Sequence, residues 1–156
     1  MLYSSSHGFP TVSGTSLLPR LDPSLSIDDV LSEEKKAAKY LISGPDISTA
    51  IGPAKAVVII DACYAGGIHC SGGNIAMFAS SSKNQPSAED RTPRSLGGLF
   101  THFMAQASTD SDLAKTLRQN LNTANFMLPF YLDSESKQNA EFHSSKASNP
   151  DKTKEK

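Results

Sequence analysis

Two side chains of this sequence have the chemistry to act together as a nucleophile and a base. Cys63 carries a thiol, which becomes a good nucleophile once it is deprotonated or paired with a base. His7 carries an imidazole, the usual general base near neutral pH. Glycines follow both residues, at position 8 and at positions 66 and 67, and let backbone and substrate approach closely. Such a pair would suit covalent catalysis if the fold brings the two side chains together.

Each of these residues follows a segment with the pattern of a β-strand. The short apolar stretch at residues 1–5 precedes His7, and the continuous β-branched run from Ala56 to Asp61 precedes Cys63. A run of this kind is typical of a strand buried on both faces of a parallel sheet. In open α/β sheets, ligands bind beyond the carboxyl ends of the strands. We therefore expect His7 and Cys63 to lie at neighbouring strand ends.

The rest of the chain predicts an α/β domain over residues 1–132. Residues 9–26 are rich in Pro and Gly and predict a loop, with a brief edge strand at Leu17 and Leu18. Periodic apolar residues predict four helices and two further strands. The helices are expected at Ser26–Tyr40, Asp46–Ile51, Gly97–Ala107 and Ser111–Ala124, and the strands at Ile75–Ala79 and Phe126–Leu132. Residues 133–156 are almost wholly polar and predict a disordered tail.

Composition excludes several classes of protein. A net charge of −1 shows no bias toward nucleic acid or an anionic membrane. Two cysteines without a CxxC pair favour neither a disulfide framework nor a zinc site. No apolar run approaches the roughly 20 residues of a membrane helix, and a signal-peptide pattern is absent from the first residues. We expect a cytoplasmic protein with no nucleic-acid or membrane partner.

Spacing alone leaves more ordinary interpretations open. A cysteine after a buried strand is most often a small core residue. A His-Gly pair is a common loop dipeptide, and Asp61 would serve equally well as a cap on a backbone turn. The remaining histidines have no spaced partner and are interpreted as surface or packing residues: His69, His102 and His143.

The segments around His7 and Cys63 resemble the caspase-like superfamily of cysteine peptidases, which includes caspases, metacaspases, paracaspases and, more distantly, legumain-type peptidases. Residues 57–67, VVIIDACYAGG, are similar to the nucleophile strand of that group. Residues 2–8, LYSSSHG, resemble its strand that ends in Ser-x-His-Gly, and His7 precedes Cys63 by 56 residues, against about 50 in caspases. Weaker similarity extends to Gln106 through residues 17–22, 75–80, 88–89 and 97–101.

The resemblance implies a cysteine endopeptidase that hydrolyses peptide bonds through a Cys63/His7 dyad. By similarity, the backbone N–H groups of Gly8 and Cys63 form the oxyanion hole, which binds the charge that develops in the transition state. Asp61 and Ser5 match positions that line the S1 pocket in metacaspase- and paracaspase-like members. A carboxylate there would pair with a basic P1 side chain, which implies cleavage after Arg or Lys. The expected substrate is a protein or peptide.

The resemblance also implies a three-layer α/β/α fold with a mostly parallel caspase-like sheet. Family members carry two strands and a helix before the histidine strand, whereas six residues precede His7 here. Three interpretations remain open: a partial domain without the first strands, a domain completed by a partner chain at the exposed sheet edge, or an inactive caspase-like interaction module. A legumain-like peptidase that cleaves after Asn is a further alternative.

Calcium is a cofactor of some metacaspases, and the sequence offers carboxylates in comparable places. Asp22, Asp28 and Asp29 follow the histidine, and carboxylates suit a hard cation. However, Cys70 occupies the position seven after the nucleophile that is acidic in calcium-dependent members. A helix N-terminus explains Asp28 and Asp29 without a metal. We therefore predict no cofactor.

Overall fold

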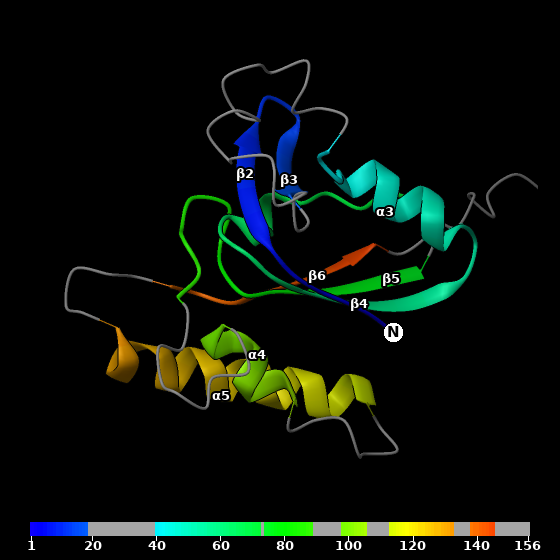
Figure 1. Ribbon diagram of the computed structural model, residues 1–156. Helices are drawn as coiled ribbons and strands as arrows, with labels where there is room; N and C mark the ends of the chain where they lie inside the picture. Colours follow the sequence, from blue (N-terminus) through cyan, green and yellow to red (C-terminus); the bar gives the residue numbers. More distant parts are fainter. Residues whose placement is uncertain (19–39, 73, 89–97, 106–112, 133–137, 146–156) are drawn as a thin grey trace, which may run out of the picture.

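The computed structural model describes residues 1–18, 40–72, 74–88, 98–105, 113–132 and 138–145. These residues form a four-stranded sheet, a two-stranded hairpin and three helices (Figure 1). In chain order the elements are β1 (Leu2–Ser5), β2 (His7–Thr11), β3 (Gly14–Leu18), α3 (Gly44–Ile51), β4 (Lys55–Asp61), the 3-10 turn η1 (Ala65–Gly67), β5 (Asn74–Ala79), α4 (Leu99–Ala105), α5 (Leu113–Tyr131) and β6 (Glu141–Ser145). The predicted helix at 26–40 lies outside the described residues.

The sheet has the strand order β1-β4-β5-β6. Strands β1, β4 and β5 run parallel, and β6 is antiparallel to β5. The prediction of a mostly parallel sheet in an α/β domain is thereby confirmed. The predicted strands at 1–5, 56–61 and 75–79 correspond to β1, β4 and β5, and the last four residues of β4 are all buried. Its β-branched residues therefore pack on both faces of the sheet.

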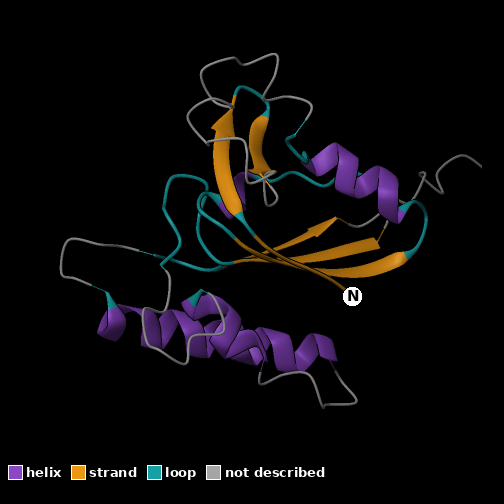
Figure 2. Cartoon of the chain, viewed as in Figure 1, coloured by secondary structure: helices purple, strands orange, loops and turns teal. Residues whose placement is uncertain are grey.

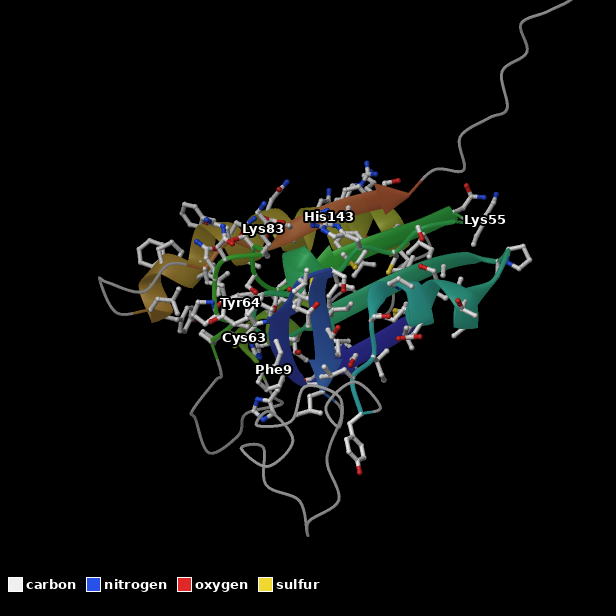
Figure 3. The ribbon with its side chains drawn as sticks, turned by 90° about the horizontal axis from the view of Figure 1, so that it is seen from above. Phe9, Lys55, Cys63, Tyr64, Lys83 and His143 are labelled. Carbon is white, nitrogen blue, oxygen red and sulfur yellow. The ribbon has the colours of Figure 1, made fainter. Side chains whose placement is uncertain are left out.

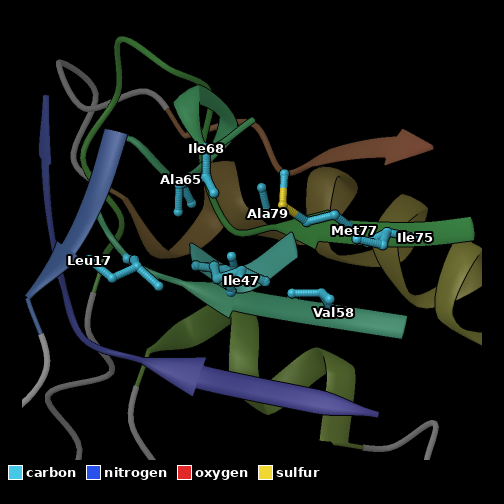
Figure 4. Close-up of a cluster of buried hydrophobic side chains, with 10 residues drawn as sticks. Leu17, Ile47, Val58, Ala65, Ile68, Ile75, Met77 and Ala79 are labelled. Carbon is cyan, nitrogen blue, oxygen red and sulfur yellow. The ribbon is translucent and has the colours of Figure 1, made fainter. Parts of the chain in front are cut away.

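The two faces of the sheet carry separate apolar clusters, because side chains alternate along each strand. On one face, Val58 and Ile60 pack with Ile47 of α3 and with residues of β5 (Figure 4). On the other face, Ile59 and Phe78 pack against α4 and α5. Figures 1 and 2 show α3 on one side of the sheet and the α4–α5 pair on the opposite side.

Helix α3 begins two residues before the predicted segment at Asp46–Ile51, and its cap explains the start. Ser43 is the N-cap, and its hydroxyl accepts a hydrogen bond from the Asp46 N–H (3.3 Å). The Asp46 carboxylate accepts in return from the Ser43 N–H (2.9 Å). This reciprocal pair is a capping box. The Ser43 hydroxyl also donates to the Asp46 carboxylate, and this bond, followed by that from the Ser43 N–H, lowers the pKa of Asp46. Pro45 fits the first turn, where its missing N–H has no cost.

The loop predicted over residues 9–26 is wrong at residues 9–11 and 14–16, which belong to the β2–β3 hairpin, whereas the brief edge strand predicted at Leu17 and Leu18 is confirmed as the end of β3. Pro10 lies within β2, where it is tolerated because β2 is an edge strand and its missing N–H is not needed there. Gly14 follows the turn with a φ of 127°, a conformation that favours glycine. Leu17 also exchanges two hydrogen bonds with Ile42, both 2.8 Å long.

The strand predicted at Phe126–Leu132 is wrong, because α5 continues to Tyr131. The buried residues of this helix recur at spacings of three and four, which is the period of a helix packed on one face. They are Leu117, Leu121, Ala124 and Leu128. Phe126 and Phe130 are 71% and 73% exposed, so their apolar character does not reflect burial in a sheet.

The disordered tail predicted over residues 133–156 is wrong at residues 138–145. Residues 141–145 form β6, which pairs with β5 along its length. Phe142 places its ring 5.0 Å from that of the buried Phe78. The polar residues around Phe142 concealed this strand, because a half-buried edge strand needs an apolar residue only on its inner face.

Strand β1 forms the opposite edge of the sheet from β6. Within the described part of the chain, its only strand partner is β4. Leu2 and Tyr3 of this strand are 42% and 44% exposed. None of the described helices has the length and apolar character needed to cross a membrane.

Candidate functional site

The sheet register brings the two predicted catalytic residues to one end of neighbouring strands. Ser5 and Asp61 are the last residues of β1 and β4, and they face each other across the parallel pair. The Ser6 N–H then donates to the carbonyl oxygen of Asp61 (3.2 Å). His7 and Cys63 each lie two residues beyond these strand ends. Figure 3 shows Cys63 beside the β2–β3 hairpin, at the end of β4 opposite Lys55.

Gly8 makes the closest contact between the histidine segment and the cysteine segment. It is buried, and a Cβ atom built on it would overlap the carbonyl oxygen of Cys63. The two main chains therefore touch, and only glycine fits at this position. His7 is exposed at the start of β2, with its ring 6.4 Å from that of Phe9. Among the described residues, no hydrogen bond joins the His7 ring to the Cys63 thiol.

The main-chain N–H groups on either side of Cys63 are both paired. The N–H of Ala62 donates to the Ser80 hydroxyl (3.1 Å), and that of Tyr64 donates to the Gln85 carbonyl (2.8 Å). For Cys63 itself, the described part of the chain offers the N–H no acceptor. A backbone donor left free at a strand end is available to an incoming oxygen atom.

The Gly8 N–H is also left free by the hairpin. Gly8 faces Leu17 in the antiparallel β2–β3 pair. Leu17 uses both its N–H and its carbonyl to bind Ile42 on its other side. Gly8 and Leu17 therefore form a non-hydrogen-bonded pair, and the Gly8 N–H is directed away from β3. Over the described ranges it has no hydrogen-bond partner, as is also true of the Cys63 N–H.

The thiol of Cys63 is half-buried against the loop that follows β5. The main-chain N–H of Ser87 donates to its Sγ atom at 3.4 Å. The next residue, Tyr64, adopts a left-handed conformation with a φ of 59° and a ψ of 21°. This conformation is costly for a residue with a side chain, and such strain gathers at functional turns.

The Asp61 carboxylate is engaged by the protein itself. Asp61 is 4% exposed, and its Oδ1 atom accepts from the Ser87 hydroxyl (2.9 Å). Its Oδ2 atom accepts from both the N–H (2.9 Å) and the hydroxyl (2.5 Å) of Thr101 at the start of α4. Ser5 is exposed beside it. The nearby Ser6 hydroxyl oxygen is buried without a hydrogen-bond partner among the described residues.

The calcium candidates Asp22, Asp28 and Asp29 lie outside the described residues. In the ranges that are described, no three His, Cys, Asp or Glu side chains are grouped so as to hold a metal ion. His69 packs against Gly14 and Gly44, the ring of His102 in α4 lies against that of Phe103, and His143 forms a 3.0 Å contact with Glu141 on β6.

Ser87, Thr101 and Gln138 were not singled out from the sequence, although all three belong to the hydrogen-bond network around Asp61. Polar residues in loops and at helix starts give no local signal of such a role, because their partners are distant in the chain. The arrangement as a whole combines a half-buried thiol, the adjacent segment that carries His7, and two backbone N–H groups without an acceptor among the described residues. No known protein family and no curated protein matches this sequence.

Proposed function

We propose that this protein is a cysteine endopeptidase in which Cys63 is the nucleophile and His7 the general base. The contact of Gly8 with the main chain of Cys63 is the observation that carries the proposal. Each of the two residues in this contact has an N–H group without an acceptor among the described residues, and free backbone donors beside a thiol are what an acyl-transfer reaction needs. The proposal includes a three-layer caspase-like architecture, in keeping with the sequence resemblance.

The reaction follows from these groups. The Cys63 thiol gives its proton to His7 as the sulfur bonds to the peptide carbonyl carbon. The carbonyl oxygen becomes an oxyanion and accepts hydrogen bonds from the N–H groups of Gly8 and Cys63. Collapse of this intermediate breaks the C–N bond, and the leaving amine takes the proton from His7. A water molecule, deprotonated by His7, then releases the acid and restores the thiol. Catalytic hydrogen bonds often shorten only when substrate binds, which suits the exposed position of His7.

Cleavage after Arg or Lys is the P1 preference that the resemblance implies for Asp61 and Ser5. A basic side chain would have to displace Ser87 or Thr101 from the Asp61 carboxylate, because both now donate to it. The proposed activity rests on the dyad and not on this preference. A substrate panel with Arg, Lys, Asn and neutral P1 residues determines the preference and tests the legumain-like alternative.

The experiment is active-site labelling of the purified chain with peptide acyloxymethyl ketone probes bearing these P1 residues. We expect one probe to label Cys63, identified by peptide mass spectrometry. Cys63→Ala and His7→Ala each abolish labelling, whereas Cys70→Ala, the matched cysteine control, retains it. Unchanged labelling in His7→Ala, or labelling of Cys70 at the same rate, would contradict the dyad.

An inactive interaction module is the second candidate, and the exposed β1 edge favours it. Leu2 and Tyr3 lie at this edge, and Tyr3 helps to line an apolar pocket of about 200 Å³ with Met104 and Leu117. An open strand edge pairs readily with another strand. This candidate predicts no labelling of Cys63 by any probe, together with concentration-dependent self-association in sedimentation that Leu2→Lys abolishes.

A further inference from the structure

The carboxylate of Asp61 and the thiol of Cys63 are joined through a single residue of the loop after β5. Ser87 donates its hydroxyl hydrogen to Asp61 Oδ1 at 2.9 Å. The main-chain N–H of the same serine donates to Cys63 Sγ at 3.4 Å. A shift of Ser87 would therefore change the surroundings of the sulfur even if Cys63 itself did not move.

Ser87 is fixed from a second side by a buried amide. Gln138 is 4% exposed, and its Nε2 donates to the Ser87 hydroxyl (3.2 Å) and to the Ser80 carbonyl (2.8 Å). Its Oε1 accepts from the N–H of Ala88 (2.7 Å). The Ser87 hydroxyl thus accepts from Gln138 and donates to Asp61, and both its roles are used. These bonds hold the N–H groups of both Ser87 and Ala88, and so fix the main chain before and after the Ser87 carbonyl.

The same carboxylate already accepts three hydrogen bonds from protein groups. Both of its oxygens accept at least one of these bonds, and it is nearly fully buried. Gly98 packs so closely on it that a Cβ atom there would overlap Oδ2. Its donors stabilise the buried charge, and removing them without replacement would cost free energy.

We infer that Asp61 is a positioning residue for Cys63, which acts by holding the Ser87 N–H against the sulfur, and that it is not the receptor for a P1 side chain. The N–H of Ser87 donates to the sulfur (3.4 Å) and its carbonyl oxygen accepts from the thiol (3.9 Å), so the position of Ser87 determines where the sulfur lies and how it is presented for attack. Gln138 supports the same serine from the side opposite Asp61. The expected effect on peptide cleavage rests on the proposed peptidase function. The expected effect on the reactivity of the Cys63 thiol rests on the geometry alone.

The test uses Ser87→Ala, which removes only the anchoring hydroxyl, and Ser87→Thr, which keeps it. Ser82→Ala, from the same loop, is the matched control. We expect Ser87→Ala to lower kcat about tenfold with little change in KM, as expected for the loss of one hydrogen bond that acts in the reaction. Ser87→Thr restores the rate, and Ser82→Ala leaves it unchanged. A wild-type kcat in Ser87→Ala would overturn the inference.

Asp61→Asn separates positioning from specificity. Substrates with P1 Arg and its neutral isostere citrulline are compared in the wild type and this variant. We expect kcat to fall for both substrates by the same factor, so that their kcat/KM ratio is unchanged. A selective loss for Arg, with citrulline cleaved as before, would instead assign Asp61 to the S1 pocket and overturn the inference.

Alkylation by iodoacetamide keeps the inference testable if no peptide is cleaved. This small reagent needs no P1 pocket, and Cys70 in the same chain serves as the internal reference. We expect Ser87→Ala to slow Cys63 alkylation about tenfold relative to Cys70 at neutral pH. If Cys63 is alkylated more slowly in Ser87→Ala but the wild type cleaves no peptide, the peptidase proposal is rejected and the positioning role of Asp61 is retained. Equal rates in wild type and Ser87→Ala would reject the positioning role alone.

Discussion

The main chain of Gly8 packs against the carbonyl group of Cys63 so closely that no side chain fits between them. Gly8 of β2 and Cys63, which follows β4, are 55 positions apart in the sequence and meet at the end of the sheet. The contact explains why His-Gly and the nucleophile segment occur together in this chain. It also makes position 8 the most sensitive point of the candidate site.

Gly8→Ala is expected to disturb both stability and activity. A methyl group forced against a backbone carbonyl costs about 1–3 kcal/mol, because neither main chain has room to move. The change also displaces the two free N–H groups, and losing one such donor lowers kcat about 10²–10³-fold. Chemical denaturation and the cleavage assay measure the two effects.

Gly72→Ala is the control for this change. A Cβ atom at Gly72 meets nothing within 4 Å, and its cost comes from the φ of 77°, about 1–2 kcal/mol. The two variants should be destabilised to a similar extent, while only Gly8→Ala loses cleavage. Loss of cleavage in both would mean that stability alone accounts for the effect.

Asn125 links α5 to the start of β6, and its removal is expected to release that strand. Its side-chain amide donates to the Ala140 carbonyl (2.9 Å), and its oxygen accepts from the Ala140 N–H (2.7 Å). Asn125→Ala leaves both main-chain groups unpaired, at a cost of about 1–3 kcal/mol. Hydrogen exchange of the β6 amides should accelerate. Asn122→Ala, on an exposed part of the same helix, should leave exchange as in the wild type. Equal protection in both variants would contradict the link.

The parts of the fold that were predicted from sequence are those with a strong local pattern. Val57 to Ile60 form a continuous apolar run, and such a run has few alternatives to a buried parallel strand. Because Cys63 comes three residues after this run, its position at the end of the strand was predicted as well. The β1 strand and His7 followed from a shorter pattern together with the resemblance.

The parts that were missed depend on contacts between distant residues. The hydrogen bonds of Asp61 to Thr101 and of Gln138 to Ser87 span 40 and 51 positions. No local spacing indicates such pairs. Strand β6 is likewise defined by pairing with β5, and only Phe142 among its residues is large and apolar. Tertiary context decides the structure of such segments.

The pH dependence of Cys70 reactivity offers a test of the packing around α3. Burial raises the pKa of the Cys70 thiol, and a hydrogen bond with Ser48 partly offsets this effect, in competition with the bond that the Ser48 hydroxyl donates to the Gly44 carbonyl (2.9 Å). In a Cys63→Ala background, Cys70 is the only thiol. Its alkylation should therefore be slow at neutral pH and rise at a higher pH than that of an unfolded thiol. Ser48→Ala removes the offsetting hydrogen bond, so the profile should move to still higher pH.

Thr49→Ala is the matched control, because the Thr49 hydroxyl donates to the Pro45 carbonyl on the exposed side of the same helix. It should leave the profile unchanged.

The raised pKa of Cys70 also predicts how the stability of the protein changes with pH. Its contribution to the free energy of unfolding is fully present below the pKa of the unfolded thiol and is lost as the pH rises through the folded pKa. Urea titrations between neutral and alkaline pH measure this loss, which should disappear in Cys70→Ala. A wild-type alkylation profile in Ser48→Ala would show that Ser48 does not contact the thiol in solution.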